Sequence, residues 1–299
     1  MHENIENIKK AIENEKLVIF VGAGVSKNSG VPTWGHLVRA YAKKLNYTQC
    51  LSCHFKTNHC EKTCHHKYRF STDEYIKIPQ YFYSHDTSDN HNDYYQLLKQ
   101  EFNKKFQPNL LNDLIVSLEP EHIITTNYDH LLDHYQYEVI QSDRDLLKAT
   151  SSHYLIKMHG DIDDLENIVF KEDDYLRFSH THSLIELYIK SLLIDHTFLF
   201  VGYSLNDYNL KMFLSWIDYL GQEKKVQENM HMNYLITCDI LPEQDYLISY
   251  YEQKHIQVIN LNNLSDELLE AARLVPLSDE IGQKTYICLQ KLLNIERNM

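Results

Sequence analysis

The sequence predicts an α/β fold in which helices cover both faces of a Rossmann-like, doubly wound parallel sheet. Short apolar runs recur along the 299-residue chain without the polar–apolar alternation of half-exposed strands, as expected for strands buried on both faces. Helix-like stretches separate these runs, and that alternating order is typical of a parallel sheet. The first run ends in a glycine-rich turn that opens a helix, which is where such sheets bind ligands.

The predicted elements follow one another in α/β order. Six apolar runs are predicted to be strands: residues 17–21, 122–125, 154–158, 197–201, 234–237 and 257–260. Predicted helices include residues 129–137, 183–195 and 206–220. Before the first strand, Ile5, Ile8 and Ile12 fall at helical spacing and indicate a surface helix.

Two segments depart from this alternation, although we expect residues 1–299 to form a single domain. Residues 47–107 are rich in His, Cys and Tyr, and we interpret them as an insertion beside the sheet with one or two helices over 93–106. Residues 265–299 predict a helical tail that covers a sheet edge or forms a subunit contact.

Four of the six cysteines lie within the insertion, in LSCHFKTNHCEKTCHH. They are Cys50, Cys53, Cys60 and Cys64. In a cytoplasmic protein this clustering favours a tetrahedral, structural zinc site over disulfides. The gap between the two pairs is short for a zinc knuckle, so a loop of free thiols is the alternative.

Charge and hydropathy exclude some classes of protein. The formal net charge of −13 argues against direct nucleic-acid binding, which needs clustered Lys and Arg. No apolar run approaches the roughly 20 residues that span a bilayer. The charged N-terminal segment does not have the form of a signal peptide, so we expect a cytoplasmic protein without membrane contact.

Polar motifs follow four of the predicted strands, at the ends where parallel sheets bind ligands. They are GAGVSKNSGVP from Gly22, TTNYD from Thr125, MHGD from Met158 and VGYSLND from Val201. Glycines let a backbone approach a pyrophosphate, and a helix N-terminus supplies N–H donors. Taken singly, each motif has a structural alternative: a tight turn, a helix cap at TTNYD, or a structural histidine at His159.

Together and in this order, the motifs resemble those of the sirtuin family. Sirtuins carry G-A-G-x-S followed by S-G-x-P, then T-x-N-x-D, His-Gly and a G-x-S turn, and the likeness extends from Leu17 to about Asn260. Lys27, which breaks a dinucleotide-binding G-x-G-x-x-G, is consistent with the sirtuin loop. Its presence argues against a hydride-transfer enzyme.

The resemblance implies a role for each matched residue. Asn127 would hydrogen-bond the ribose or the attacking water, Asp129 would accept from the nicotinamide carboxamide, and His159 would act as a base. The remaining matched residues would bind NAD around its pyrophosphate, with Asn260 at the adenosine: Gly22, Ala23, Gly24, Ser26, Pro32, Thr126, Gly202, Ser204 and Asn260.

Two departures separate this chain from the lysine-deacylating sirtuins. Thr33 and Trp34 follow Pro32 where those enzymes have an aromatic residue and Arg, and the Phe-Gly-Glu segment and zinc ribbon after the histidine are missing. The variant is similar to the bacterial sirtuin-like branch of antiphage systems, whose members hydrolyse NAD to ADP-ribose and nicotinamide. We therefore predict an NAD hydrolase acting in abortive infection. The alternatives are an NAD-dependent deacylase and a binding module without turnover.

An unrestrained NAD hydrolase would kill its own cell, so the resemblance also implies gating. Since only the helical tail follows Asn260, we expect either a homo-oligomer or a separately encoded sensor, such as a ring-forming ATPase of the HerA type.

Overall fold

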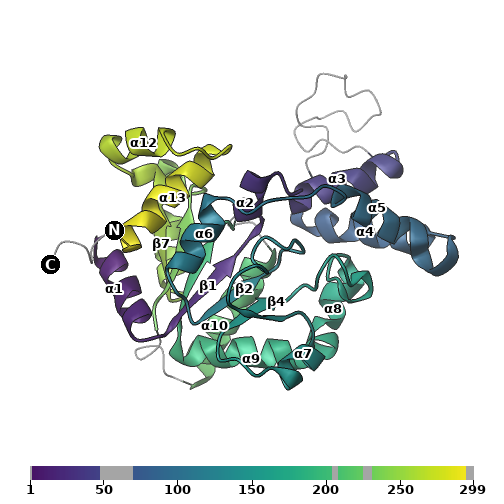
Figure 1. Cartoon of the computed structure of the whole chain (residues 1–299), viewed down its shortest axis with the longest axis horizontal. Coiled ribbons are helices and arrows are strands. Elements are labelled where there is room, and N and C mark those ends of the chain that lie inside the picture. Colours follow the sequence, from purple (N-terminus) through teal and green to yellow (C-terminus); the bar gives the residue numbers. More distant parts are fainter. Residues whose placement is uncertain (1, 48–69, 204–207, 225–230, 294–299) are drawn as a thin grey trace.

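The computed structural model describes residues 2–47, 70–203, 208–224 and 231–293, and places a seven-stranded sheet at the centre of the molecule (Figure 1). The strands are β1 (Leu17–Val21), β2 (His122–Thr125), β3 (Glu138–Ile140), β4 (Tyr154–Lys157), β5 (Thr197–Val201), β6 (Asn233–Thr237) and β7 (Ile256–Asn260). Their order is β3-β4-β2-β1-β5-β6-β7, and every pairing among these strands is parallel. The predicted α/β fold with a doubly wound parallel sheet is confirmed.

The chain reverses its direction of travel across the sheet at β1. The strands that follow β1 first build outward through β2, and the chain then returns to place β5 on the other side of β1. A parallel sheet binds its ligands where the strand order reverses, outside the carboxyl ends of the strands. A ligand site is therefore expected at the loops after β1, β2, β4 and β5.

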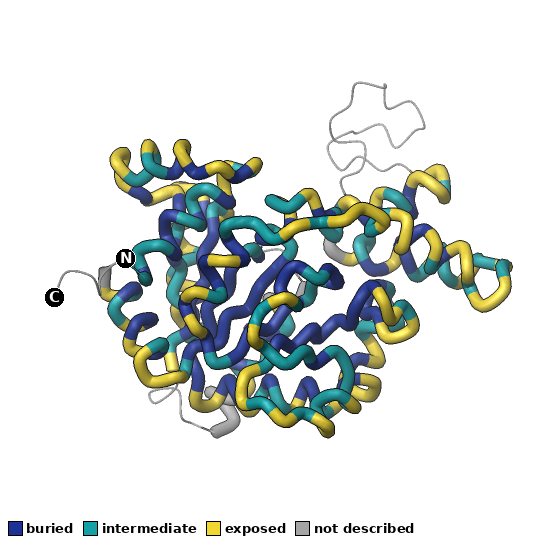
Figure 2. The backbone as a smooth tube through the Cα atoms, in the orientation of Figure 1, coloured by how far each residue is buried: buried dark blue, intermediate teal, exposed yellow. Residues whose placement is uncertain are grey.

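Helices cover both faces of the sheet because successive side chains of each strand point to opposite faces. Leu17, Ile19 and Val21 join the core beneath one helical layer, whereas Val18 and Phe20 join the core beneath the other. The first layer holds α1 (His2–Glu13), α6 (Leu110–Ser117), α12 (Asp266–Arg273) and α13 (Glu280–Leu293). The second holds α7 (Asp143–Lys148), α8 (Glu172–Thr181), α9 (Ser183–Asp195), α10 (Tyr208–Lys224) and α11 (Tyr246–Glu252). Figure 2 shows that the central strands are buried between these layers.

A group of three helices, the helical lobe, extends to one side of the sheet (Figure 1). It consists of α3 (Trp34–Lys44), α4 (Thr72–His85) and α5 (Asn92–Glu101), whose shared hydrophobic core also includes residues of the loops after β2 and β4. Ser71 begins α4 with a capping box to Glu74, and the Tyr41 hydroxyl donates to the Tyr94 carbonyl at 2.8 Å. Within the insertion, α4 precedes the helical segment expected over 93–106, which the structure places at α5. The four clustered cysteines lie outside the described residues.

The remaining helical elements are short. A four-residue helix α2 (Ala23–Ser26) follows β1, and the 3₁₀ turns of the described residues are η1 (Lys27–Ser29), η2 (Asp89–His91), η3 (Leu165–Asn167), η5 (Pro242–Gln244) and η6 (Leu261–Asn263). The predicted helical tail is confirmed as α12 and α13. Among the described residues, no helix combines the length and the apolar character that crossing a membrane requires.

The predicted helix over 129–137 is wrong, since this segment forms turns that lead into β3. The Lys157 ammonium donates to the carbonyl of Asp129 at 2.8 Å and contacts that of Tyr128 at 3.5 Å. In a helix these carbonyls would accept from backbone N–H groups four residues later. The apolar residues of the segment instead meet the sheet core in an irregular path, and strand β3 was not predicted.

Three glycines let the loops after β1 and β5 touch through their backbones. The Gly24 N–H donates to the Gly202 carbonyl at 3.0 Å, and the Gly22 N–H donates to the Val201 carbonyl at 2.8 Å. A Cβ atom on Gly22 or Gly24 would lie 2.6 or 2.8 Å from the Gly202 oxygen. Gly202 itself has φ +78°, a left-handed conformation that favours glycine.

We predict that Gly24→Ala lowers the free energy of unfolding by about 1–3 kcal/mol, because its methyl group has no room against the Gly202 backbone. Gly35→Ala is the matched control, since its Cβ would lie 3.3 Å from the hydroxyl end of the Tyr75 side chain and a helix favours alanine. Urea unfolding of both variants checks this. Equal stability of the two variants would show that the loop contact is not tight.

Candidate active site at the carboxyl ends of the central strands

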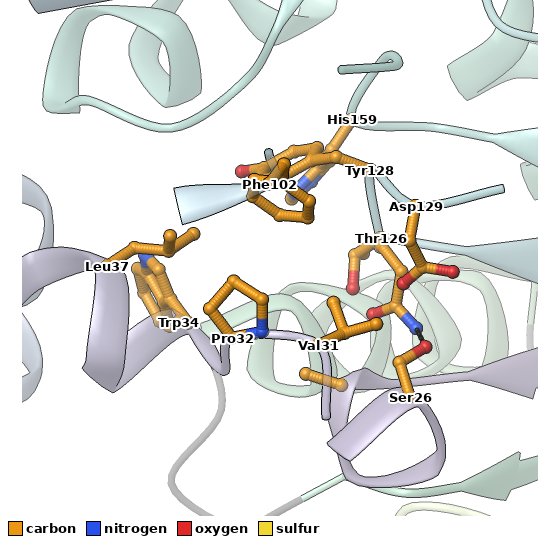
Figure 3. Close-up of a pocket in the computed structure, with 12 residues that line it drawn as sticks. Ser26, Val31, Pro32, Trp34, Leu37, Phe102, Thr126, Tyr128, Asp129 and His159 are labelled. Carbon is orange, nitrogen blue, oxygen red and sulfur yellow. Dashed lines mark hydrogen bonds between the residues drawn. The ribbon is translucent and has the colours of Figure 1, made fainter. Parts of the chain in front are cut away.

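A small cavity lies where the loops after β1, β2 and β4 meet the helical lobe (Figure 3). Its volume is about 50 Å³. Its lining residues are Ala23, Ser26, Val31, Pro32, Trp34, Leu37, Phe102, Thr126, Asn127, Tyr128, Asp129 and His159. The structure thus brings together all three residues that sequence reasoning assigned to catalysis, together with Ala23, Ser26, Pro32 and Thr126.

The side-chain amide of Asn127 is held in one orientation by the glycine loop. Its Nδ2 donates to the Ser26 hydroxyl at 2.9 Å and contacts the Gly22 carbonyl at 3.3 Å. A carbonyl can only accept, so the nitrogen must face the loop. The Asn127 backbone N–H donates to the Thr125 hydroxyl at 3.0 Å, which fixes the turn after β2. Oδ1 is therefore the atom of this amide that is left for a ligand.

The carboxyl group of Asp129 is buried, and only one of its oxygens is used by the protein. Oδ1 accepts from the Leu131 N–H at 3.1 Å, whereas Oδ2 is buried without a hydrogen-bond partner. Burial raises the pKa of Asp129, and the Leu131 N–H, the Ser26 hydroxyl and the Lys157 ammonium oppose that rise. A buried acceptor without a partner costs free energy, which a ligand N–H in this cavity would recover.

The imidazole of His159 is also buried and incompletely bonded. Its Nε2 has no hydrogen-bond partner, and its ring packs edge-on against Tyr175 and Phe178. Burial, and to a smaller extent the nearby His182, lowers the pKa of His159 to about 3. The ring is thus neutral near pH 7, and an unprotonated Nε2 can accept a hydrogen bond from a hydroxyl or a water.

Apolar side chains from the helical lobe close the opposite side of the cavity. Figure 3 shows Trp34 and Leu37 across the cavity from Thr126 and Asp129, with Phe102 at its edge beside Tyr128. Sequence reasoning noted Trp34 as a departure but missed the role of Leu37 and Phe102. Phe102 is the C-cap residue that follows α5, it lies outside every motif, and no local pattern marks it.

A second, larger cavity of about 260 Å³ adjoins the first, since Ala23 and Trp34 line both. Its lining residues are Ala23, Gly24, Val25, Lys27, Thr33, Trp34, Gly35, Leu111, Gly202, Tyr203, Ile236, Thr237, Cys238, Asp239, Asp279, Ile281, Gly282 and Thr285. It extends from the glycine loop past the ends of β5 and β6 to the start of α13. Sequence reasoning did not assign the residues after β6 or those of α13 to a site.

Two predicted binding residues do not line either cavity. Gly22 acts through its backbone, as described above. Asn260 ends β7, where its amide donates to the Ile240 carbonyl at 2.9 Å and accepts from the Asn262 N–H at 3.0 Å, so its polar atoms close a turn. Ser204 lies outside the described residues, as do Cys50, Cys53, Cys60 and Cys64, whose assignment to zinc stays a prediction.

A fully buried lysine joins the loops that carry the candidate catalytic residues. Lys157, the last residue of β4, binds the carboxylate of Asp161 and lies 3.4 Å from that of Asp133, besides the carbonyls of the turn after β2. His130 closes the group, with its Nδ1 2.7 Å from Asp133. His130, Asp161 and Asp163 could in principle ligate a metal, but the Lys157 ammonium already supplies the positive charge there.

Comparison with known proteins agrees with the order of motifs. Residues 121–259 match the family model described as "SIR2-like domain". This part of the chain is therefore similar to a SIR2-like domain. The matched residues run from the start of β2 to the last strand, and so include Asn127, Asp129, His159 and Gly202.

Two relatives are similar to this chain over most of the chain's own length. "Defense-associated sirtuin 2" of Bacillus subtilis is 35% identical over 273 residues, which cover 88% of this chain and 25% of that protein. "NAD(+) hydrolase ThsA" of Enterococcus faecium is 28% identical over 248 residues, which cover 80% of this chain and 46% of that protein. The chain thus spans less than half the length of either relative.

A solved structure is similar at lower identity. It is a crystal structure of Sir2 in complex with an inhibitor, 2′-O-acetyl-ADP-ribose and a deacetylated peptide, with 18% identity and a TM-score of 0.40. The match covers 82% of this chain and 90% of that one.

We predict that Lys157→Met lowers the free energy of unfolding by about 3–5 kcal/mol, because it leaves the buried Asp161 carboxylate without its cationic partner and the Asp129 carbonyl without its donor. Lys77→Met is the control, since Lys77 pairs with Asp73 on the exposed surface of α4. Chemical denaturation measures both. A similar, small effect of the two substitutions would show that Lys157 does not hold these loops.

Acid should destabilise the fold through its buried histidines. In the unfolded chain His159 titrates near pH 6.5, whereas its folded pKa is lowered to about 3. The stability that this difference provides is present above pH 6.5 and is lost as the pH falls toward 3. His122, whose pKa burial lowers to about 4, contributes in the same direction.

The thermal midpoint should therefore fall as the pH is lowered from 7 to 4, and fall less steeply in His159→Gln. His134→Gln, at an exposed position, should keep the wild-type slope. Thermal melting curves of the three proteins, recorded over this pH range, measure these slopes. Parallel slopes for all three proteins would contradict the buried, neutral state of His159.

Proposed function

We propose that this chain hydrolyses NAD at the bond between nicotinamide and ribose, and that it acts as a gated effector of antiphage defence. The observation that carries the proposal is the small cavity in which Asn127, Asp129 and His159 each leave an acceptor for a ligand. This cavity adjoins a glycine loop at the start of a helix and a second, larger cavity. A dinucleotide laid across the loop would place one nucleoside in each cavity.

The glycosidic bond would break with a transition state that resembles an oxocarbenium ion. Positive charge develops on the ribose, so a buried carboxylate beside it stabilises the transition state more than it would in water. Asp129 is suited to this role, and its unpartnered Oδ2 can also accept from the carboxamide N–H of nicotinamide. That second contact would orient the leaving group.

Water or a ribose hydroxyl would be held by Asn127 and His159. Because the Asn127 nitrogen is taken by Ser26 and Gly22, its Oδ1 is the atom that accepts from the nucleophile or the ribose. His159 would accept through Nε2. With a pKa lowered to about 3 it is a weak base, so we assign it first to holding the hydroxyl in place and only then to moving its proton.

The alternative functions fit the cavities less well. A deacylase must admit an acyl-lysine beside the ribose, but Trp34, Leu37 and Phe102 fill that side of the first cavity. A binding module without turnover needs no unpartnered acceptors at the ribose, and both Asp129 and His159 have them. Hydrolysis uses all of these features.

The defence role rests on the names of the relatives, one a defence-associated sirtuin and others NAD(+) hydrolases. Because an unrestrained NAD hydrolase would deplete the NAD of its own cell, we propose that the chain is gated, either by assembly into a homo-oligomer or by a sensor such as a HerA-type ATPase. Size-exclusion chromatography with light scattering, combined with an NAD assay of each fraction, tests gating. A constitutively active monomer would refute it.

We predict that Asn127→Ala and His159→Ala each reduce NAD cleavage by at least about 100-fold, the scale of a lost transition-state contact. His134→Ala, at an exposed histidine, should cleave as fast as wild type. Chromatography of nicotinamide and ADP-ribose after incubation with NAD measures this, with circular dichroism to check folding. Full turnover by both folded site variants would refute the assignment of Asn127 and His159 to NAD cleavage.

A further inference from the structure

The second cavity carries a charge arrangement that the hydrolysis of NAD does not itself require. Three charged side chains line it: Lys27, Asp239 and Asp279. Their formal charges sum to −1. The cavity nevertheless lies beside the N-terminus of α13, which by itself would favour a bound anion. The carboxylate of Asp279 is the reason that the cavity is negatively charged at this helix end.

The carboxylate of Asp279 occupies the position that an anion would take. Its Oδ1 accepts from the Lys27 ammonium at 2.5 Å, and its Oδ2 accepts from the Gly282 N–H at 3.2 Å, in the first turn of α13. The same residue donates its N–H to Asn28 Oδ1 at 3.2 Å, so it is anchored to the turn after the glycine loop. Both the lysine and the helix N-terminus are thereby satisfied by the protein itself.

The other charged residues near the cavity do not change its net negative charge. Lys284, one turn further along α13, pairs with Glu280 at 2.7 Å. Asp239 follows β6 at the other side of the cavity, where its N–H donates to the Thr237 hydroxyl at 3.0 Å. Lys27 and Lys284 therefore both have a carboxylate partner, and Asp239 adds a further negative charge.

The position of the cavity suggests which part of a dinucleotide meets these charges. The first cavity holds the candidate catalytic residues and so takes the nicotinamide ribose, if the proposed function holds. The glycine loop between the cavities suits the pyrophosphate. The adenosine then lies in the second cavity, whose walls combine apolar Leu111, Ile236 and Ile281 with polar groups at the strand ends.

We propose that Asp279, aided by Asp239, makes this site selective for NAD over NADP. The two dinucleotides differ only by a phosphate on the 2′-hydroxyl of the adenosine ribose. A carboxylate can accept a hydrogen bond from that hydroxyl but repels the phosphate, and dinucleotide enzymes use this difference widely. In this chain Lys27 and the α13 N-terminus could bind the phosphate, but Asp279 masks both.

The test compares kcat/KM for NAD and NADP in wild type, Asp279→Asn, Asp279→Asn with Lys27→Met, and Glu280→Gln. Asparagine still caps a helix but frees the lysine, so we expect kcat/KM for NADP to rise about tenfold or more while that for NAD changes less than about threefold. The added Lys27→Met should reverse the gain. Glu280→Gln removes a neighbouring charge that does not line the cavity and should leave the ratio unchanged.

Equal use of both dinucleotides by wild type, or an unchanged ratio in Asp279→Asn, would overturn the proposal, as would an equal gain in Glu280→Gln. Calorimetric binding of ADP-ribose and 2′-phospho-ADP-ribose to the same four proteins separates it from the proposed function. If wild type cleaves neither dinucleotide, hydrolysis is refuted. A binding preference that Asp279→Asn relaxes still supports the role of Asp279, and equal binding throughout refutes it.

Discussion

The backbone contact between the loops after β1 and β5 is the constraint on which the site depends. In most doubly wound sheets the loops on either side of the reversal in strand order diverge and leave a crevice. Here Gly24 donates to the Gly202 carbonyl, and a side chain at either position would separate the loops. Both cavities lie next to this contact, and Ala23 of the glycine loop lines both of them.

The buried ammonium of Lys157 and the helical lobe hold the other sides of the site. A charged group that is buried away from water needs hydrogen-bond and ionic partners within the protein. Lys157 contacts carboxylates and carbonyls of the loops that carry the candidate catalytic groups. These contacts offset the cost of burial and also fix the loops in position. Trp34, Leu37 and Phe102 of the lobe then supply the apolar wall that the sheet loops lack. The core of the lobe also contains Tyr128, Ile168 and Phe170 from the loops after β2 and β4, so this wall is packed directly against the loops of the sheet.

The sequence by itself determined the parallel sheet and the edge at which the site lies. Strands buried on both faces must be apolar throughout, so six of the seven strands were predictable, as was the helical tail. Motifs that follow parallel strands necessarily meet at one edge, which is why the order of the motifs was enough to group Asn127, Asp129 and His159. Strand β3, only three residues long, was too short to give such a pattern.

Only the tertiary structure decided the features that depend on distant partners. Residues 129–137 have the composition of a helix, but the Asp129 carbonyl accepts from Lys157, which is 28 positions away, instead of from a backbone N–H of a following helical turn. Phe102 enters the cavity from an insertion whose own pattern points to no site. Asp279 meets Lys27 across 252 positions of sequence, and Asn260 turns away from the cavities to close a turn. In each case the deciding interaction is a contact between separate parts of the chain, which local patterns do not encode.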